Sequence, residues 1–291
     1  MVGPEVKLAT PAARHARRGV HVLALMPFLL FNLGLFAVPI ARTLARSVLE
    51  PSIGVANFAV ALNDPLYQQV LWTTLRISVE VTLLSILLAY PVASFAVDCS
   101  KLTRNIVLAL VLVPFWTSLL VRVYGWTFIL QRTGPINEML LWLGIIDRPL
   151  KLIYTEAAVV IGITHYMLPF MIFVLFTALN ALDRRLKPAA AALGARPSRI
   201  FLTVTLPLIT PGLVAGSVLV FIGTIGFFVT PALLGSPAQM MVANLITFEV
   251  KESLNWPMAA TMSVVLMAVV GVFSWIYFRF LDRSGFQVGG T

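Results

Sequence analysis

One carboxylate in the sequence lies where it could bind a cation inside a membrane. Glu80 falls within a largely apolar stretch near residues 72–98. A charge inside a bilayer costs on the order of 3 kcal/mol on insertion scales, so it usually faces a cavity or a partner charge. Two interpretations stay open: Glu80 binds an ammonium group, or it pairs with Arg76 one helical turn earlier.

Aromatic side chains are a second group that could contact a cation, because a cation is attracted to the face of an aromatic ring. The residues concerned in the next apolar stretch are Trp116, Tyr124 and Trp126. Aromatic residues also gather where helices cross the membrane surface, so an aromatic belt is the other interpretation. Arg122 lies among them, and we expect its long side chain to reach the membrane surface.

A third candidate group precedes a proline in the longest uncharged part of the chain. It consists of Phe227, Phe228 and Thr230. These residues either line a pathway through the membrane or serve ordinary helix packing, and both interpretations stay open.

The sequence contains no pattern typical of an enzyme or of a metal site. Gly-Lys never occurs, so the chain lacks the GxxxxGK[ST] phosphate loop and is not expected to bind ATP in that manner. The histidines at 15, 21 and 165 are scattered, and Cys99 is the only cysteine, so neither a metal cluster nor an internal disulfide is predicted. We expect His165 to pack at a helix interface, and we expect this chain to bind no cofactor.

The composition is that of an integral membrane protein. Of the 291 residues, 59% are hydrophobic and 11% are charged, whereas a soluble domain carries about 25% charged residues. The apolar stretches are long enough for helices and do not show the short alternation of a membrane β-barrel. A soluble globular enzyme is therefore excluded.

The apolar stretches predict six membrane-spanning helices, since a helix needs ~20 mostly apolar residues to cross. They lie near residues 20–41, 72–98, 105–128, 157–180, 206–230 and 257–280. The first is interpreted as an uncleaved anchor because it is too long for a signal peptide. We expect Pro91, Pro114 and Pro169 to bend three of the others.

No charge occurs from Ile200 to Phe248, which could conceal two spans. Thr230-Pro231 and the Gly-Ser-Pro sequence at 235–237 are predicted to break the helix, because proline disfavours helix at and before its position. The remainder, Gln239 to Phe248, is too short to cross. We therefore predict a re-entrant or interfacial segment on the outer side.

The distribution of Lys and Arg predicts that both termini lie in the cytoplasm. Cytoplasmic segments are then the tail 1–19, residues 99–104, residues 181–205 and the tail 281–291, which hold most of the 21 Lys and Arg residues. Residues 42–71 would be periplasmic. The net charge of +9 is thus interpreted as membrane topology and not as a nucleic-acid site.

The longest cytoplasmic loop contains a short helix made of small residues. Pro188 can begin it, because the first helical N–H has no partner in any case, and the alanines that follow favour helix. Gly194 is expected to end it in a left-handed turn. A thin, exposed helix of this kind suits docking into a groove on a partner protein.

The spacing in this loop resembles a motif of the membrane subunits of binding-protein-dependent ABC importers. That motif reads Glu-Ala-Ala, three residues, Gly, nine residues, and Ile-x-Leu-Pro. This chain has Pro188-Ala189-Ala190, then Gly194, then Val204-Thr205-Leu206-Pro207 at the same spacing, with Pro188 where Glu is usual. The segment 112–137, residues 230–235 and residues 255–257 are similar to the spermidine/putrescine-type subgroup.

The resemblance implies an all-α membrane protein with six transmembrane helices and the MetI-like architecture of type I importer permeases, with both termini cytoplasmic. The permease core would comprise residues 72–280, with a coupling loop at 181–206. The residues that the resemblance assigns to ATPase coupling are Pro188, Ala189, Ala190, Gly194, Ala195, Arg196, Leu206 and Pro207.

The same resemblance implies a permease subunit of an ATP-driven importer in the bacterial inner membrane, without catalytic activity of its own. Its substrate would be a small organic cation such as spermidine or putrescine. The implied partners are a second permease subunit, two ATP-binding subunits that hold ATP and Mg, and a periplasmic or lipid-anchored solute-binding protein. Alternatives are a permease for an opine, amino-acid-like or phosphonate solute, or, in another class, a secondary transporter or channel.

Overall fold

The computed structural model describes residues 26–50 and 53–283, and within these ranges all regular structure is helical. Five helices are long and apolar enough to cross a membrane, and a bent pair passes the same test together. The five are Met26–Leu49, Pro65–Asp98, Glu156–Asn180, Pro197–Ile225 and Trp256–Arg279, and the bent pair is Lys101–Trp116 with Leu119–Trp142. The predicted all-α fold is confirmed, with six spans when the bent pair counts as one. The tail 1–19, the first residues of span 20–41 and most of the tail 281–291 lie outside the described residues.

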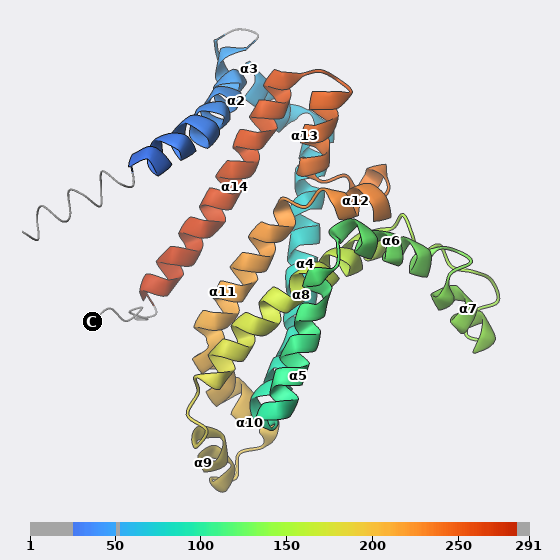
Figure 1. Ribbon diagram of the computed structural model, residues 1–291, viewed down its shortest axis with the longest axis vertical. Helices are drawn as coiled ribbons and strands as arrows, with labels where there is room; N and C mark the ends of the chain where they lie inside the picture. Colours follow the sequence, from blue (N-terminus) through green and yellow to red (C-terminus); the bar gives the residue numbers. More distant parts are fainter. Residues whose placement is uncertain (1–25, 51–52, 284–291) are drawn as a thin grey trace, which may run out of the picture.

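Figure 1 labels the helices in chain order. The elements are η1 (Leu33–Ala37), α2 (Val38–Leu49), α3 (Ala56–Asn63), α4 (Pro65–Asp98), α5 (Lys101–Leu112), η2 (Val113–Trp116), α6 (Leu119–Leu130), α7 (Pro135–Trp142), α8 (Glu156–Asn180), α9 (Leu186–Ala192), α10 (Pro197–Ile200), η3 (Phe201–Thr205), α11 (Leu206–Ile225), α12 (Val229–Leu234), η4 (Pro237–Gln239), α13 (Val242–Lys251) and α14 (Trp256–Arg283). The short helix α9 lies at one end of the bundle, and α3 and α13 lie at the opposite end (Figure 1).

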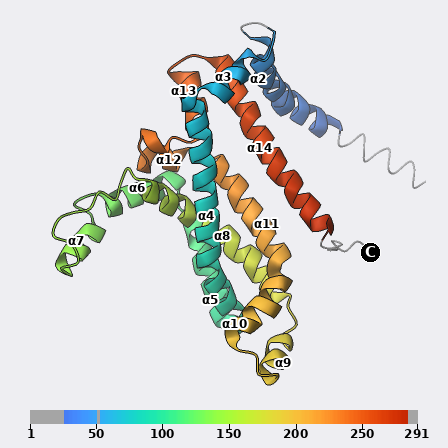
Figure 2. The same cartoon turned by 180° about the vertical axis from the view of Figure 1, so that it is seen from behind.

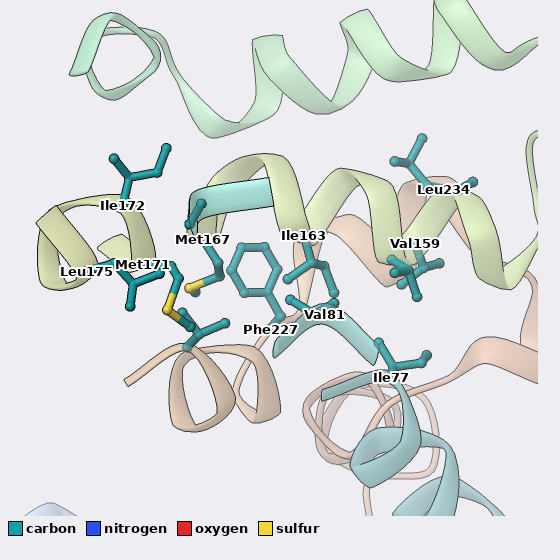
Figure 3. Close-up of a cluster of buried hydrophobic side chains, with 14 of the residues drawn as sticks. Ile77, Val81, Val159, Ile163, Met167, Met171, Ile172, Leu175, Phe227 and Leu234 are labelled. Atoms are coloured by element: carbon teal, nitrogen blue, oxygen red, sulfur yellow. The ribbon is translucent and has the colours of Figure 1, made fainter. Parts of the chain in front are cut away.

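The core lies where α4, α8 and α11 pack against one another. Ile77 and Val81 of α4, Ile163 and Met171 of α8, and Phe227 after α11 belong to one buried hydrophobic cluster (Figure 3). These side chains recur at helical spacing, so each helix presents one apolar face to the others. The three helices therefore form the central unit against which the remaining elements are placed.

The contact between α8 and α11 is close because α11 carries glycines at the interface. A Cβ atom at Gly212 would lie 2.5 Å from the Cβ of Ala178, and one at Gly216 would lie 2.8 Å from the Sδ of Met171. Small residues let two membrane helices approach and gain van der Waals contact, which drives their association within lipid. No larger side chain fits at Gly212 without separating the helices.

The end opposite α9 is closed by α3, α13 and the adjoining ends of α4 and α14 (Figure 2). α13 has ten residues and is not among the helices able to span a membrane, as predicted for this segment. Glu249 of α13 is only 4% exposed, and the hydroxyl of Tyr67 in α4 donates a hydrogen bond of 2.7 Å to its Oε1. This bond fixes α13 to the start of α4.

The third span differs from the single helix predicted at 105–128. It breaks after η2 into α5 and α6, and the two parts are bent by 96°. The main-chain N–H of Thr117 and its Oγ1 both donate to the carbonyl of Pro114, at 3.2 and 2.8 Å, and Thr117 has extended backbone angles. Local side-chain bonding thus ends the helix where we expected Pro114 only to bend it.

The fifth span also differs from the prediction of 206–230. The continuous helix begins at Pro197 and ends at Ile225, so Phe227 lies outside it. We expected Thr230-Pro231 to break a helix, but both residues lie within α12. Pro231 is the third residue of α12, where its missing N–H has no helical carbonyl to bond.

The helix that contains the predicted second span begins before residue 72. α4 starts at Pro65, and the side chain of Asp64 accepts a hydrogen bond of 2.8 Å from the N–H of Leu66. An Asp cap followed by proline in the first position is a strong helix start.

We expect Tyr67→Phe to destabilise the protein. The change leaves the buried Glu249 carboxylate without its hydroxyl donor, and hydrogen bonds to charged groups contribute about 1.5–3 kcal/mol. The measurement is thermal unfolding of the purified protein in detergent, with Tyr277→Phe as the control. A melting temperature lowered by several degrees for Tyr67→Phe alone is expected, whereas equal values for both variants would contradict the role of this bond.

We also expect Gly212→Val to prevent close packing of α8 on α11, because its side chain would overlap Ala178. Gly271→Val in α14 is the matched control, since a Cβ there meets nothing within 4 Å. The amount of monodisperse protein recovered from membranes measures the effect. Gly212→Val should be recovered poorly and Gly271→Val normally; comparable recovery would show that the two helices need no close contact.

Candidate functional site

The exposed end of the bundle is formed by α9, which joins α8 to the start of the fifth span (Figure 1). The helix begins at Leu186, two residues before the predicted start at Pro188, and Pro188 therefore occupies its first turn. Pro188 and Ala189 are exposed, and Leu193 just beyond the helix is 89% exposed.

The turn after α9 has the geometry predicted from Gly194. This glycine has φ +80, a left-handed conformation that other residues rarely adopt. The N–H of Gly194 donates a hydrogen bond of 2.9 Å to the carbonyl oxygen of Ala191, and the N–H of Ala195 donates one of 3.2 Å to the carbonyl oxygen of Ala190. These two bonds form a Schellman motif. Arg196 then starts α10 in an extended conformation.

Leu206 and Pro207 are not part of α9 but begin α11. Pro207 has no N–H, and just before it the chain forms the π-turn η3, in which the N–H of Leu206 bonds to the carbonyl of Phe201. Pro207 also lines an apolar cleft of about 640 Å³ between α8 and α11, together with Ala178 and Leu182. The second half of the sequence motif thus follows α9 in the chain and lies where the loop joins α11.

A group of charged residues lies on α4 and the start of α8. The Nε of Arg76 lies 3.9 Å from Glu80 Oε1, and its Nη2 bonds to Glu156 Oε2. The side chains are 43%, 41% and 27% exposed, respectively. Two carboxyl groups contact one guanidinium, so the formal charge of the group is negative. The expected contact between Glu80 and Arg76 is present, and the stronger bond of Arg76 goes to Glu156.

Sequence reasoning did not identify Glu156. Its local signal is that of an acidic residue in the first turn of a helix, after the capping residue Thr155. That position by itself favours a carboxylate through the helix dipole. Only the packing of α8 on α4 brings it to Arg76, which precedes it by 80 positions.

The three aromatic candidates of the third span do not form one surface. Trp126 packs inward, and its Nε1 donates a hydrogen bond of 3.2 Å to Nδ1 of His165. Trp116 and Tyr124 are 80% and 60% exposed. His165 therefore lies at the interface of α6 and α8, as we expected, and Trp126 is its partner.

Arg122 contacts α8 and the break in the third span. Its guanidinium carbon lies 5.0 Å from the centre of the Tyr166 ring, and its Nη2 donates a hydrogen bond of 3.0 Å to the carbonyl oxygen of Thr117. The break in the span supplies that carbonyl, and the ring attracts the cation. Tyr166 belongs to an aromatic cluster of which sequence reasoning named only Phe227. The cluster consists of Phe115, Tyr166, Phe170 and Phe227.

The three candidates after α11 are likewise divided. Phe227 is 8% exposed and meets Tyr166 edge-on at 5.1 Å between ring centres. Thr230 is fully buried, whereas Phe228 is 41% exposed. Phe227 and Thr230 thus pack within this chain, and of the three only Phe228 presents a surface.

Comparison with known proteins identifies the family. Residues 81–284 match the family described as binding-protein-dependent transport system inner membrane component. The chain is 38% identical over 223 residues to the spermidine/putrescine transport system permease protein PotB of Salmonella typhimurium, covering 77% of each chain. It is 37% identical to PotB of Escherichia coli over 218 residues, covering 75% of this chain and 79% of that protein. YdcU, an inner membrane ABC transporter permease protein of Escherichia coli, is 32% identical over 250 residues, covering 81% and 77%.

Solved structures share the fold at lower identity. A chain of the bacterial alginate ABC transporter, in complex with an alginate-bound periplasmic protein, superposes with a TM-score of 0.76 at 19% identity, covering 94% of this chain and 98% of that one. A chain of the MetNI methionine ABC transporter gives a TM-score of 0.55 at 19% identity, covering 76% and 98%. Together with the family match, this confirms the resemblance found in the sequence. The chain belongs to the binding-protein-dependent transport system inner membrane components, and it is a multi-pass permease subunit of an ABC importer in the bacterial inner membrane.

Proposed function

We propose that this permease forms part of the pathway for a small organic cation of the spermidine/putrescine class. The observation that carries the proposal is the 38% identity to a spermidine/putrescine permease over 77% of both chains. The negatively charged group on α4 and α8 supports it, since two carboxyl groups and one guanidinium carry a formal negative charge that attracts ammonium groups.

In this proposal α9 docks on a cytoplasmic ATPase, and both termini lie on the same side as α9. Its exposed alanines and Leu193 would enter a groove of the partner, and the Schellman turn at Gly194 would fix the direction in which the chain leaves that groove. ATP and Mg would be bound by the partner, because this chain has no phosphate loop. A second permease and a solute-binding protein would complete the importer.

The proposed coupling residues serve different parts of this contact. Pro188, Ala189 and Ala190 form the helix, Gly194 and Ala195 form its end, and Arg196 starts the return. Leu206 and Pro207 lie at the base of the loop, where they would link α9 to α11.

We expect Gly194→Val to weaken docking of the ATPase. A β-branched residue is strongly disfavoured at positive φ, so the end of α9 would rearrange. Gly144→Val is the matched control, because Gly144 has φ +66 in a loop after α7, also with nothing within 4 Å of its Cβ. The measurement is co-purification of the ATPase from native membranes. A loss of about 10-fold or more corresponds to the ~1.4 kcal/mol that a left-handed residue costs; equal recovery with both variants would show that α9 is not the docking helix.

We expect Glu80→Gln and Glu156→Gln to lower uptake of putrescine and spermidine, because either change removes the formal negative charge of the group. Glu138→Gln, an exposed carboxylate of α7, is the control. Uptake is measured in vesicles that contain the complete importer with ATP inside. Unchanged uptake in both variants removes this group from the pathway.

The same vesicles test the alternatives. Uptake of an opine, amino-acid-like or phosphonate solute, with no uptake of polyamine, would favour the other substrate classes. Uptake that persists without ATP and without the ATPase would favour a secondary transporter or channel.

A further inference from the structure

Arg122 connects three parts of the fold that lie far apart in the sequence. It belongs to α6, just after the break in the third span, and it donates a hydrogen bond to the carbonyl oxygen of Thr117. Its guanidinium lies over the ring of Tyr166 in α8. That ring meets Phe227, which lies in the break after α11. One side chain thus joins α6 to α8 and, through Tyr166, to the end of α11.

The hydrogen bond to Thr117 answers a requirement of the break. The carbonyl of Thr117 lies between two helices that are bent by 96°, so it belongs to neither helical hydrogen-bond ladder. An unsatisfied backbone group is costly at membrane depth, and it must find a donor within the protein. The Arg122 guanidinium is that donor.

The position of the Arg122 charge indicates a role beyond the hydrogen bond to the Thr117 carbonyl. The guanidinium lies over the Tyr166 ring of the neighbouring helix. Its Nε is buried and has no hydrogen-bond partner among the described residues, so its polar bonding is incomplete. A charge that is kept within a span at such a cost usually marks function.

Arg122 contacts α8 at Tyr166 and reaches the end of α11 through the contact of Tyr166 with Phe227, and these two helices flank α9. α8 runs into the α9 loop, α11 begins just after it, and the close contact at Gly212 makes the two helices one unit. A displacement at α9 therefore reaches Tyr166 and Phe227 through packed helices. α6 follows only if it is attached to that unit. It is attached by the buried Val123 and Leu130 and by two further contacts, that of Arg122 with Tyr166 and the bond of Trp126 to His165.

We propose that Arg122 is a positioning residue that attaches α6 to the α8–α11 unit, so that a displacement of α9 also moves α6. The proposal rests on the proposed function, because it takes α9 as the docking site of the ATPase. Arg122 acts through Tyr166 and Thr117 and is not assigned a contact with the substrate.

The first experiment compares substrate uptake with ATP hydrolysis in vesicles that contain the complete importer. Arg122→Gln keeps a donor for Thr117 but loses the charge over Tyr166, and Arg122→Lys keeps both. We expect Arg122→Gln to lower the amount imported per ATP hydrolysed by about 10-fold, with unchanged KM, and Arg122→Lys to restore most of it. A role in stability alone would change the amount of importer but not this ratio.

A pair of variants at Tyr166 supplies the control. Tyr166→Phe keeps the ring face and removes only a hydroxyl, so it should behave as wild type, whereas Tyr166→Leu should match Arg122→Gln. If Arg122→Gln does not accumulate, this pair decides the question. Wild-type ratios in Arg122→Gln, or equal ratios in the two Tyr166 variants, overturn the proposal.

The second experiment does not depend on the substrate. On a Cys99→Ser background, which has no other cysteine, spin labels at exposed Phe128 of α6 and Leu219 of α11 report the distance between these helices. We expect a narrow distribution in wild type and Arg122→Lys and a broad one in Arg122→Gln. An unchanged distribution overturns the proposal. If Arg122→Gln broadens the distance distribution but neither wild type nor any variant imports polyamine, the result supports the positioning role of Arg122 and rejects the proposed substrate.

Discussion

The close contact of α8 and α11 is the constraint on which the other features depend. In lipid there is little hydrophobic gain from pressing two apolar helices together, so their association relies on close packing. Gly212 and Gly216 allow this packing by removing side chains that Ala178 and Met171 would otherwise meet. The loop between the two helices reverses the chain and contains α9. The Schellman turn at Gly194 ends α9, which lies exposed at the end of the bundle.

The same pair of helices organises the opposite half of the molecule. Tyr166 and Phe227 meet because α8 and the end of α11 are held together, and their rings form the surface on which Arg122 lies. α4 packs on α8 and brings Arg76 to Glu156. The proposed coupling helix α9, the Arg122 contact and the Arg76–Glu156 pair are thus all attached to the packed unit of α8 and α11. The packed helices therefore connect these sites physically. Coupling between the sites requires that the unit has two stable positions.

The breaks in the spans are as informative as the helices. At Thr117 and again at Gly226–Phe227 the chain leaves helical geometry within a long apolar sequence. Backbone groups freed in this way need partners inside the protein. At the first break these are the Pro114 carbonyl for Thr117 and the guanidinium of Arg122 for the Thr117 carbonyl. Near the second break, Asn244 donates a hydrogen bond of 2.9 Å to the carbonyl of Phe228. Both breaks are therefore built features of the fold.

The sequence by itself determined the features that arise from local physics. Apolar stretches of spanning length predicted the helices, and Pro188, the alanines and Gly194 predicted α9 with its left-handed end, because helix starts and ends depend on neighbouring residues. Pro114 signalled a disturbance but not its extent, since proline can either bend or end a helix. Only the tertiary structure placed Glu156 beside Arg76 and folded Arg122 over Tyr166. Each of these pairs joins different helices, and their meeting depends on how the helices rotate and pack, which no local pattern encodes.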